Sequence, residues 1–215
     1  LNSVAVCASG GTALWTANKL DYNNMLVVGV EKLLSNTSAR VTDDIMMASE
    51  RIYEQTEGMN FPAQNALIAQ QYMLKYGATL DDLALVAYKN HQNAYLNPKA
   101  RFYNKEVTLK QIKNSPIVAS PLRLFDRSLS VNGAAAVIIT KDKTDIEITG
   151  SGLFVDRLSA FESIDMTSWE ATKLAANEAY KQAGITPEDL DIAEIHDAFT
   201  SVELISYEDL GFCKK

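Results

Sequence analysis

Two residues that could carry covalent and acid–base chemistry occupy similar places in the sequence. Cys7 ends the apolar run 4–6 and is followed by the small residues 8–11. The periodicity of residues 13–20 predicts a helix there. Free backbone N–H groups and the positive dipole end of such a helix favour an anion, so this thiol should ionise more readily than a free one. Position alone leaves two alternatives open, a nucleophile and an inert, buried cysteine.

His196 follows a predicted short strand, 192–195, and precedes a predicted helix, 199–210. A cysteine and a histidine at the carboxyl ends of two strands indicate a functional site more specifically than either residue alone, because ligands of α/β sheets bind at that edge. We therefore favour a functional role for His196 over a capping role. The other histidine, His91, lies in a polar helical stretch and is expected on a solvated face. Cys213 receives no role.

The sequence lacks the usual motifs for metals and nucleotides. Two histidines and two cysteines this scattered do not have metal-ligand spacing, so no metal site is expected. The phosphate-loop pattern G-x-x-x-x-G-K and the dinucleotide pattern G-x-G-x-x-G are also absent from the sequence.

Several strands must position the two candidate residues. Residues 25–30 read as a fully buried strand, and strand, turn, helix and strand together predict a parallel βαβ unit. Further strands are expected at 134–140, also buried, and at 146–155. The fold class is therefore α/β.

Helical patterns dominate residues 33–124. Helices are expected at 43–55, at 62–76 with a stop at Gly77, from the N-cap Thr79 towards residue 97, and at 108–114. We interpret this region as a helical insertion over the carboxyl ends of the strands. After the last strands, a further helix is expected at 170–183.

Composition limits the class of protein. The 215 residues are 47% hydrophobic and 22% charged, as in a soluble globular protein, and the net charge of −7 argues against a nucleic-acid surface. Two cysteines do not form a disulfide framework, so a reducing, cytoplasmic location is expected. The apolar runs are too short to cross a bilayer, so no membrane insertion is expected.

Six sequence segments, in this order, resemble the thiolase family: VCASGGTAL, MLVVGVEKL, KNHQNAYLNPKARF, SPIVASPLRLFD, VNGAAAVIIT and HDAFTSVELISYEDLGF. The last is similar to the sterol-carrier-type and archaeal members. The resemblance implies two similar βαβαβ halves in an α/β/α/β/α body. It assigns residues 1–32 and 125–141 to an incomplete N-terminal half, 33–124 to a helical loop-domain insertion and 142–215 to an incomplete C-terminal half.

The resemblance also implies roles for single residues. Cys7 matches the nucleophile that takes an acyl group from a coenzyme A thioester. His196 matches the residue that positions a water for the thioester enolate. Positions that contact coenzyme A are matched by Ser128, Ala198, Phe199 and, less surely, Met59. Some sterol-carrier-type members have an acid/base cysteine where Ala198 stands, so that proton shuttle is lacking. The family's Asp-Gly before the alanine-rich strand is Asn132-Gly133 here.

The implied activity is acyl transfer of the thiolase type, either Claisen condensation of acyl-CoAs or thiolysis of a 3-ketoacyl-CoA. Coenzyme A thioester is the expected substrate, with no permanently bound cofactor. The expected partner is a second copy, in a homodimer or dimer of dimers that buries the region Ser3–Val6. The match is to the middle of a thiolase, and the family's Gly-His-Pro histidine would follow Lys215, so residues 1–215 alone are not expected to complete turnover.

Two alternatives remain open. The first is a non-catalytic acyl-CoA or lipid-binding protein in an assembly with a synthase partner. The second, more distant, is a cysteine-type α/β-hydrolase, which is disfavoured because Cys7 lacks the flanking glycines of the nucleophile elbow.

Overall fold

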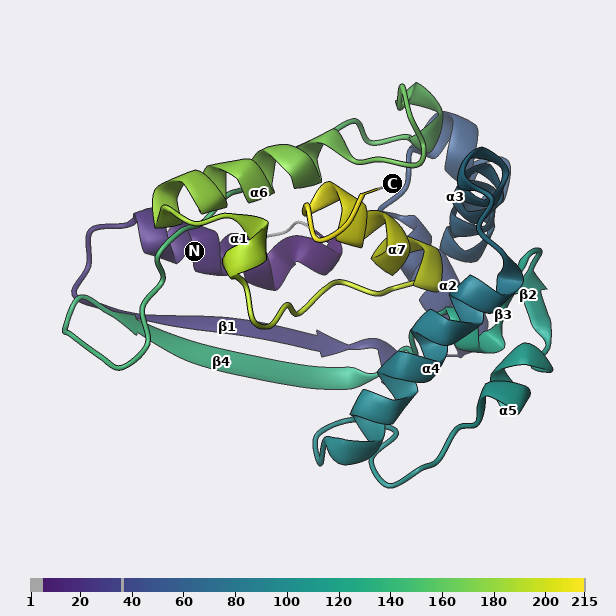
Figure 1. The fold of residues 1–215 in the computed structure, drawn as a ribbon, viewed down its shortest axis with the longest axis horizontal. Helices are drawn as coiled ribbons and strands as arrows, with labels where there is room; N and C mark the ends of the chain where they lie inside the picture. The colour runs from purple at the N-terminus through teal and green to yellow at the C-terminus, as the bar shows by residue number, and fades with distance from the viewer. Residues whose placement is uncertain (1–5, 36, 215) are drawn as a thin grey trace. The chain divides into compact units, whose positions relative to one another are not determined.

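The computed structural model describes residues 6–35 and 37–214, which form a mixed α/β structure (Figure 1). Two compact units are present. The first unit contains Leu1–Ala48, Ser130–Asp156 and Glu170–Asp189, and the second contains Ser49–Leu129, Arg157–Trp169 and Leu190–Lys215. The α/β class predicted from the sequence is confirmed. The domain boundaries implied by the resemblance stay a prediction.

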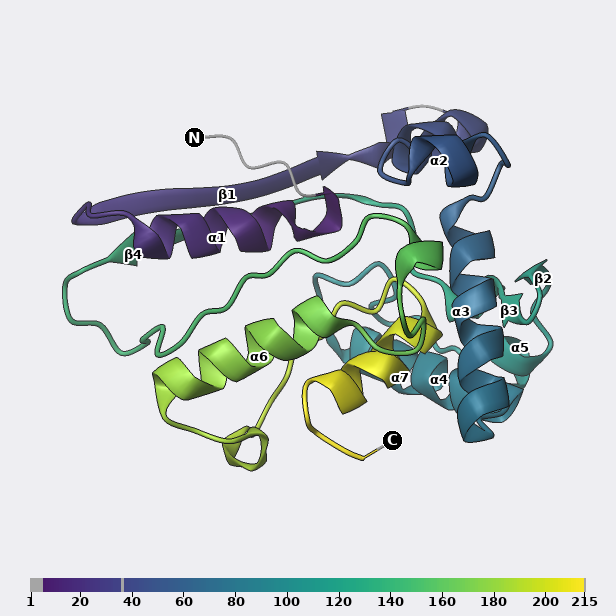
Figure 2. The ribbon, with the colours of Figure 1, turned by 90° about the horizontal axis from the view of Figure 1, so that it is seen from above.

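The first unit contains a two-stranded antiparallel ribbon with a helix against it. Helix α1 (Ser9–Lys19) follows the 3-10 turn Val6–Ala8 and lies along strand β1 (Asn24–Lys32) (Figure 2). Strand β1 pairs with β4 (Asn132–Thr140) from Asn24 opposite Thr140 to Lys32 opposite Asn132. The strand expected before Cys7 falls largely on residues 1–5, which lie outside the described residues.

Both strands were predicted, but their environment differs from the prediction. Val27 is the buried residue of β1, and β4 is exposed along most of its length. The expectation of buried strands was wrong because α1 packs against β1 and leaves most of β4 exposed. Leu26 and Val30 of β1 are 68% and 73% exposed. Strands β1 and β4 pair antiparallel, while the parallel pairing expected between β1 and the strand before Cys7 involves residues outside the described ones.

Residues 146–155 were expected to form a strand, and the structure shows an extended segment without strand pairing. This segment lies against helix α6 (Glu170–Ala183). A Cβ atom at Gly152 would lie 2.0 Å from the carbonyl oxygen of Ala175, and one at Gly150 would lie 2.2 Å from that of Ala179. Only glycine permits such a close approach of two backbones.

The single helix expected at 43–55 consists of two elements. The short turn Leu33–Ser35 leads to α2 (Ser38–Met46), and a π-helical turn covers Arg51–Gln55. The Glu50 carboxylate starts this turn by accepting the backbone N–H groups of Ile52 and Tyr53, at 2.8 and 2.6 Å. The prediction was wrong because this side-chain cap begins a new element in the middle of the range.

The second unit has helices whose ends follow the sequence signals. Helix α3 (Phe61–Tyr76) ends at Gly77, whose φ is +73°. Helix α4 (Leu80–Leu96) starts with a capping box formed by Thr79 and Asp82, and α5 (Leu109–Lys113) starts with another. These three helices confirm the predictions for 62–76, 79–97 and 108–114.

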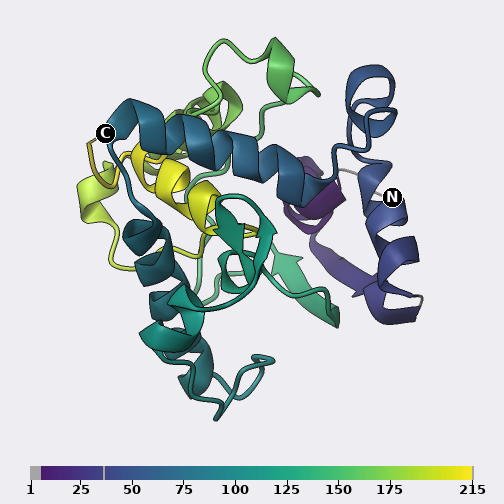
Figure 3. The same cartoon turned by 90° about the vertical axis from the view of Figure 1, so that its right-hand side faces the viewer.

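Helix α7 (Thr200–Asp209) packs against both α3 and α4 (Figure 3). Below it lies a core formed by Ala66, Ala69, Leu83, Leu122 and Phe199. A small hairpin, β2 (Ile117–Ala119) and β3 (Leu122–Arg123), contributes Leu122 and was not predicted. The remaining 3-10 turns are Leu124–Asp126, Ala160–Glu162 and Pro187–Asp189.

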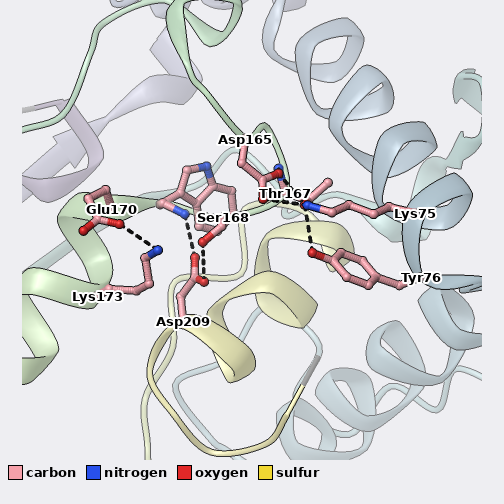
Figure 4. A network of polar contacts seen from close by, with 9 residues as sticks. Lys75, Tyr76, Asp165, Thr167, Ser168, Glu170, Lys173 and Asp209 are labelled. Atoms are coloured by element: carbon pink, nitrogen blue, oxygen red, sulfur yellow. Dashed lines mark hydrogen bonds and ion pairs between the residues drawn. The ribbon is translucent and has the colours of Figure 1, made fainter.

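A polar network holds the segment 157–169 within the second unit (Figure 4). Lys75 Nζ lies 2.7 Å from Asp165 Oδ2, while Asp165 Oδ1 accepts the backbone N–H of Thr167. On α7, Asp209 accepts the Ser168 hydroxyl at 2.8 Å and the next backbone N–H at 2.6 Å.

None of the helices in residues 6–35 and 37–214 combines the length and apolar character that crossing a bilayer requires.

Candidate active site

Cys7 lies in the turn that leads directly into α1, and it is exposed. The residue before it, Val6, has a φ of +51°, a region that β-branched residues rarely adopt. The Ser9 hydroxyl donates to the Val6 carbonyl at 2.7 Å and holds this turn. The N-cap residue Ala8 forms no side-chain cap hydrogen bond. The thiol is thus not the buried cysteine of the inert alternative, and its role as a nucleophile stays a prediction.

Two glycines near Cys7 leave the start of α1 without side chains at positions 10 and 11. A Cβ atom at Gly10 or Gly11 would meet nothing within 4 Å, so open space lies where these two side chains would point. The Cα of Gly10 would lie 3.8 Å from a Cβ at Gly29, which places this turn against β1. A ligand can therefore approach the backbone of the first turn closely.

His196 is exposed in the loop that precedes α7. The strand expected at 192–195 is not formed, and the loop is instead fixed by residues on its carboxyl side. The N–H of Ser128 donates to the Ala198 carbonyl at 2.9 Å, and Arg127 forms an antiparallel bridge with Phe199. The structure thus brings Ser128, Ala198 and Phe199 together beside His196.

These neighbours are partly built into the core. Phe199 is 7% exposed and packs with Leu122, and Ala198 packs against the same cluster. The next residue, Thr200, donates its hydroxyl to Asp126 at 3.2 Å. Burial raises the pKa of the Asp126 carboxyl, while hydrogen bonds from the Arg123 N–H and Thr200 oppose that rise.

Met59 is half-buried just before α3. Its backbone contacts are local: its carbonyl accepts Gln64 Nε2 at 3.0 Å and its N–H donates to the Glu54 carbonyl. The coenzyme contact that the resemblance implies for Met59 stays a prediction.

The sequence analysis missed a polar cluster behind the His196 loop. Its centre is Glu203 on α7, which is 2% exposed. Lys89 Nζ and the Tyr207 hydroxyl donate to Glu203 Oε1, and Asn90 Nδ2 donates to Oε2 at 2.6 Å. Burial would raise the pKa of Glu203, but these three hydrogen bonds outweigh it and the pKa lies below its ordinary value. No local signal marks this cluster, because Lys89 and Asn90 lie 114 and 113 positions away from Glu203 in the sequence.

His91 is not on a solvated face. Its ring packs edge-on against Phe102 and Phe125, with centroid distances of 4.4 and 5.2 Å, and burial lowers its pKa. Its Nδ1 atom is buried and has no hydrogen-bond partner among the described residues. The expectation failed because the aromatic residues that cover His91 lie outside its own helix.

In the part of the chain that the structure describes, no group of three or more histidine, cysteine or acidic side chains could hold a metal ion. Cys7 and Cys213 are both free and exposed. Cys7 belongs to the first unit and His196 to the second, and their convergence on one pocket stays a prediction.

Residues 3–121 match the family model described as "Thiolase, N-terminal domain", and residues 152–215 match "Thiolase C-terminal domain-like". The acetyl-CoA acetyltransferase of Methanothermobacter thermautotrophicus is 38% identical over 98% of this chain and 57% of the relative. That of Methanocaldococcus jannaschii is 41% identical over 98% of this chain and 56% of the relative.

Among solved structures, the "Ltp2-ChsH2(DUF35) aldolase" is similar to 99% of this chain and 58% of that chain, with a TM-score of 0.78 and 26% identity. Human mitochondrial 3-ketoacyl-CoA thiolase shares the fold, with a TM-score of 0.63 and 16% identity over 95% of this chain and 62% of that chain. The chain spans a little over half the length of the two acetyltransferases. It belongs to the thiolase family.

Proposed function

We propose that this chain is the part of a thiolase-type acyltransferase that carries the nucleophile, with Cys7 accepting an acyl group from a coenzyme A thioester. The observation that carries the proposal is the exposed Cys7 thiol in the turn that opens α1. Backbone N–H groups at a helix start favour the negative charge of a thiolate and of a nearby oxyanion. Relatives named acetyl-CoA acetyltransferase, at 38% and 41% identity, support this chemistry.

The proposed reaction has two steps. The Cys7 thiolate adds to the thioester carbonyl, the C–S bond to coenzyme A breaks, and the leaving thiolate takes a proton, which gives acyl-Cys7 and free coenzyme A. A second acyl-CoA then loses an α-proton to a base. Its enolate carbon forms a C–C bond with the acyl carbon, and Cys7 leaves as the thiolate. Thiolysis of a 3-ketoacyl-CoA is the same path in reverse.

His196 would act in the second step. Its imidazole, on an exposed loop next to fixed residues, would hold a water that donates a hydrogen bond to the enolate oxygen. Ser128 and Ala198 lie side by side in the same unit and would contribute to the coenzyme surface. Phe199 would support that surface from the core, and Met59 would add to it.

The proposal extends to assembly and location. Two copies would pair through the region of Ser3–Val6, and the two free thiols suit a reducing compartment such as the cytoplasm. We also propose a second, different protein partner. It is supported by a relative named "Benzoylsuccinyl-CoA thiolase subunit BbsB", from Thauera aromatica, and by the similar aldolase with a DUF35 component.

A second candidate is an acyl-CoA-binding protein without acyl transfer. Relatives named "Sterol carrier protein 2", such as the bovine protein at 29% identity over 96% of this chain, favour it. This candidate needs the coenzyme surface and does not need the Cys7 thiol.

The deciding experiment is denaturing mass spectrometry of the intact protein after brief exposure to acetyl-CoA. We expect one added acetyl group, mapped to Cys7, and its loss in Cys7→Ser. Cys213→Ser is the matched control and should acylate like the wild type. Saturable acyl-CoA binding without acylation would support the second candidate and refute the first.

A further inference from the structure

We propose that Asn90, on α4, is a positioning residue that holds the His196 loop in its working conformation. The inference rests on the proposed function for its kinetic consequences, while its structural part stands on the contacts of the second unit. Asn90 has no assigned role in the proposed chemistry, and its side chain donates to Asp197 and Glu203.

The two hydrogens of one amide connect the loop to the core. Asn90 Nδ2 donates to Asp197 Oδ2 at 2.9 Å and to Glu203 Oε2 at 2.6 Å. Asp197 is the residue directly after His196, and Glu203 is buried on α7. An amide nitrogen has two N–H donors, so it can serve two carboxylates at once. Asn90 therefore ties the loop to α4 and α7 through a single side chain.

The anchor at Glu203 is itself rigid. Its other oxygen accepts from Lys89 Nζ and from the Tyr207 hydroxyl, and Lys89 Nζ also donates to the Tyr207 hydroxyl at 2.8 Å. Hydrogen bonds that involve a charged partner are roughly twice as strong as neutral ones. A donor held against this buried carboxylate has little freedom, so it presents its second hydrogen to Asp197 in a fixed direction.

The loop is also held at its other side. The Ser128 N–H donates to the Ala198 carbonyl, and Phe199 lies in the core. Directly after His196, the side chain of Asp197 is thus held by a hydrogen bond from a residue distant in the sequence. Loss of that bond would release the backbone at 196–197 while leaving Ala198 and Phe199 in place. A small displacement of a group that aligns reactants is costly for the rate.

Four variants of the intact protein test this inference. Asn90→Ala removes both donors, and Asn90→Asp keeps the shape but sets a third carboxylate against Asp197 and Glu203. Asp197→Ala breaks only the link to the loop and leaves Glu203 paired, so it remains informative if the Asn90 variants fail to fold. Asn93→Ala is the matched control, because Asn93 is exposed on the same helix and makes no side-chain hydrogen bond within the described residues.

The first readout is backbone order from NMR relaxation. In Asn90→Ala and Asp197→Ala, the order parameter S² at residues 196 and 197 should fall from the value of an ordered backbone, about 0.85, towards about 0.6. Order parameters in α3 should match those of the wild type. In Asn90→Asp, which sets like charges side by side, the fall should be at least as large as in Asn90→Ala.

The second readout is acyl transfer. In Asn90→Ala we expect kcat to fall by about ten- to a hundredfold with KM within about twofold of the wild type, because binding is kept and alignment is lost. Formation of acyl-Cys7 should be less affected than the condensation step. Asn93→Ala should match the wild type in both readouts.

The two proposals fail in different ways. If the wild-type protein forms no acyl-Cys7, the proposed function is wrong, and the relaxation data still decide whether Asn90 holds the loop. Unchanged order parameters at residues 196 and 197 in both Asn90→Ala and Asp197→Ala would overturn the positioning role, whatever the kinetics show. An equal effect in Asn93→Ala would overturn it too.

Discussion

Replacing Gly152 by alanine tests the closest backbone approach in the first unit. An added Cβ would lie 2.0 Å from the Ala175 carbonyl oxygen and 2.7 Å from its carbon, whereas ordinary van der Waals contact begins at 3.4 Å. The extended segment and α6 would therefore have to separate by more than an ångström along this contact. The obstacle is helix backbone, so no side-chain rotation relieves it.

The size of the effect follows from two opposing contributions. Overpacking of a filled interior costs about 1 to 3 kcal/mol, and an obstacle made of backbone places Gly152→Ala near the upper end. Alanine has less conformational freedom than glycine in the unfolded chain, and this stabilises the folded state by about 0.4 to 1 kcal/mol. The free energy of unfolding should fall by about 2 kcal/mol, which lowers Tm by roughly 4 to 8 °C in a protein of this size.

Urea and thermal unfolding of the intact protein measure this change. Gly133→Ala is the matched control, because a Cβ at Gly133 meets nothing within 4 Å, and it should stay within about 0.5 kcal/mol of the wild type. Adding Ala175→Gly to Gly152→Ala should not restore stability, since the obstructing atoms are those of the backbone. A Gly152→Ala protein as stable as the Gly133→Ala protein, or a rescue by Ala175→Gly, would refute the reasoning.

Three further predictions concern single side chains. Thr79→Ala removes the capping box of α4 and should lower the free energy of unfolding by about 1 kcal/mol in urea titrations; an unchanged midpoint would contradict this. In the folded protein, burial would raise the pKa of Asp165, but hydrogen bonds from Lys75 and its neighbours hold it well below the ordinary value. A lowered pKa stabilises the fold above the unfolded-state pKa, so Asp165→Asn should be less stable at pH 7 and the difference should shrink as pH falls below about 4; a gap that is constant with pH would count against it. Iodoacetamide should label Cys7 before Cys213, because burial and a nearby carboxylate raise the pKa of the Cys213 thiol; peptide mass spectrometry decides, and equal labelling would contradict the expectation.

Local signals predicted the helices well. The ends of α3 and α4 are set by Gly77 in the left-handed region and by the Thr79 cap, both of which act within a few residues. Glu50 is a local cap as well, and overlooking it merged α2 with the π-helical turn.

Pairing and burial were harder to predict because they depend on distant residues. The apolar segments 146–155 and 192–195 have strand-like composition, yet a strand forms only where a partner offers its hydrogen bonds. The antiparallel match of β1 with β4 joins residues about a hundred positions apart, which the pattern within each strand does not reveal.

In the candidate site too, local features could be predicted from the sequence and long-range contacts could not. The place of Cys7 before a helix follows from a run of neighbouring residues, and the structure shows it there, exposed. The hydrogen bonds of Asn90 to Asp197 and Glu203 join residues 107 and 113 positions apart, which no local spacing in the sequence indicates. The aromatic cover of His91 comes from outside its own helix in the same way.

The left-handed conformation of Val6 has a consequence for engineering this protein. A β-branched residue at a φ of +51° costs of order 1–3 kcal/mol that glycine would not, so a screen for thermal stability would favour Val6→Gly. The same exchange would loosen the turn that presents the neighbouring thiol. If Cys7 is the nucleophile that we propose, stability and reactivity make opposite demands on this position, and selection for heat resistance alone would lower activity.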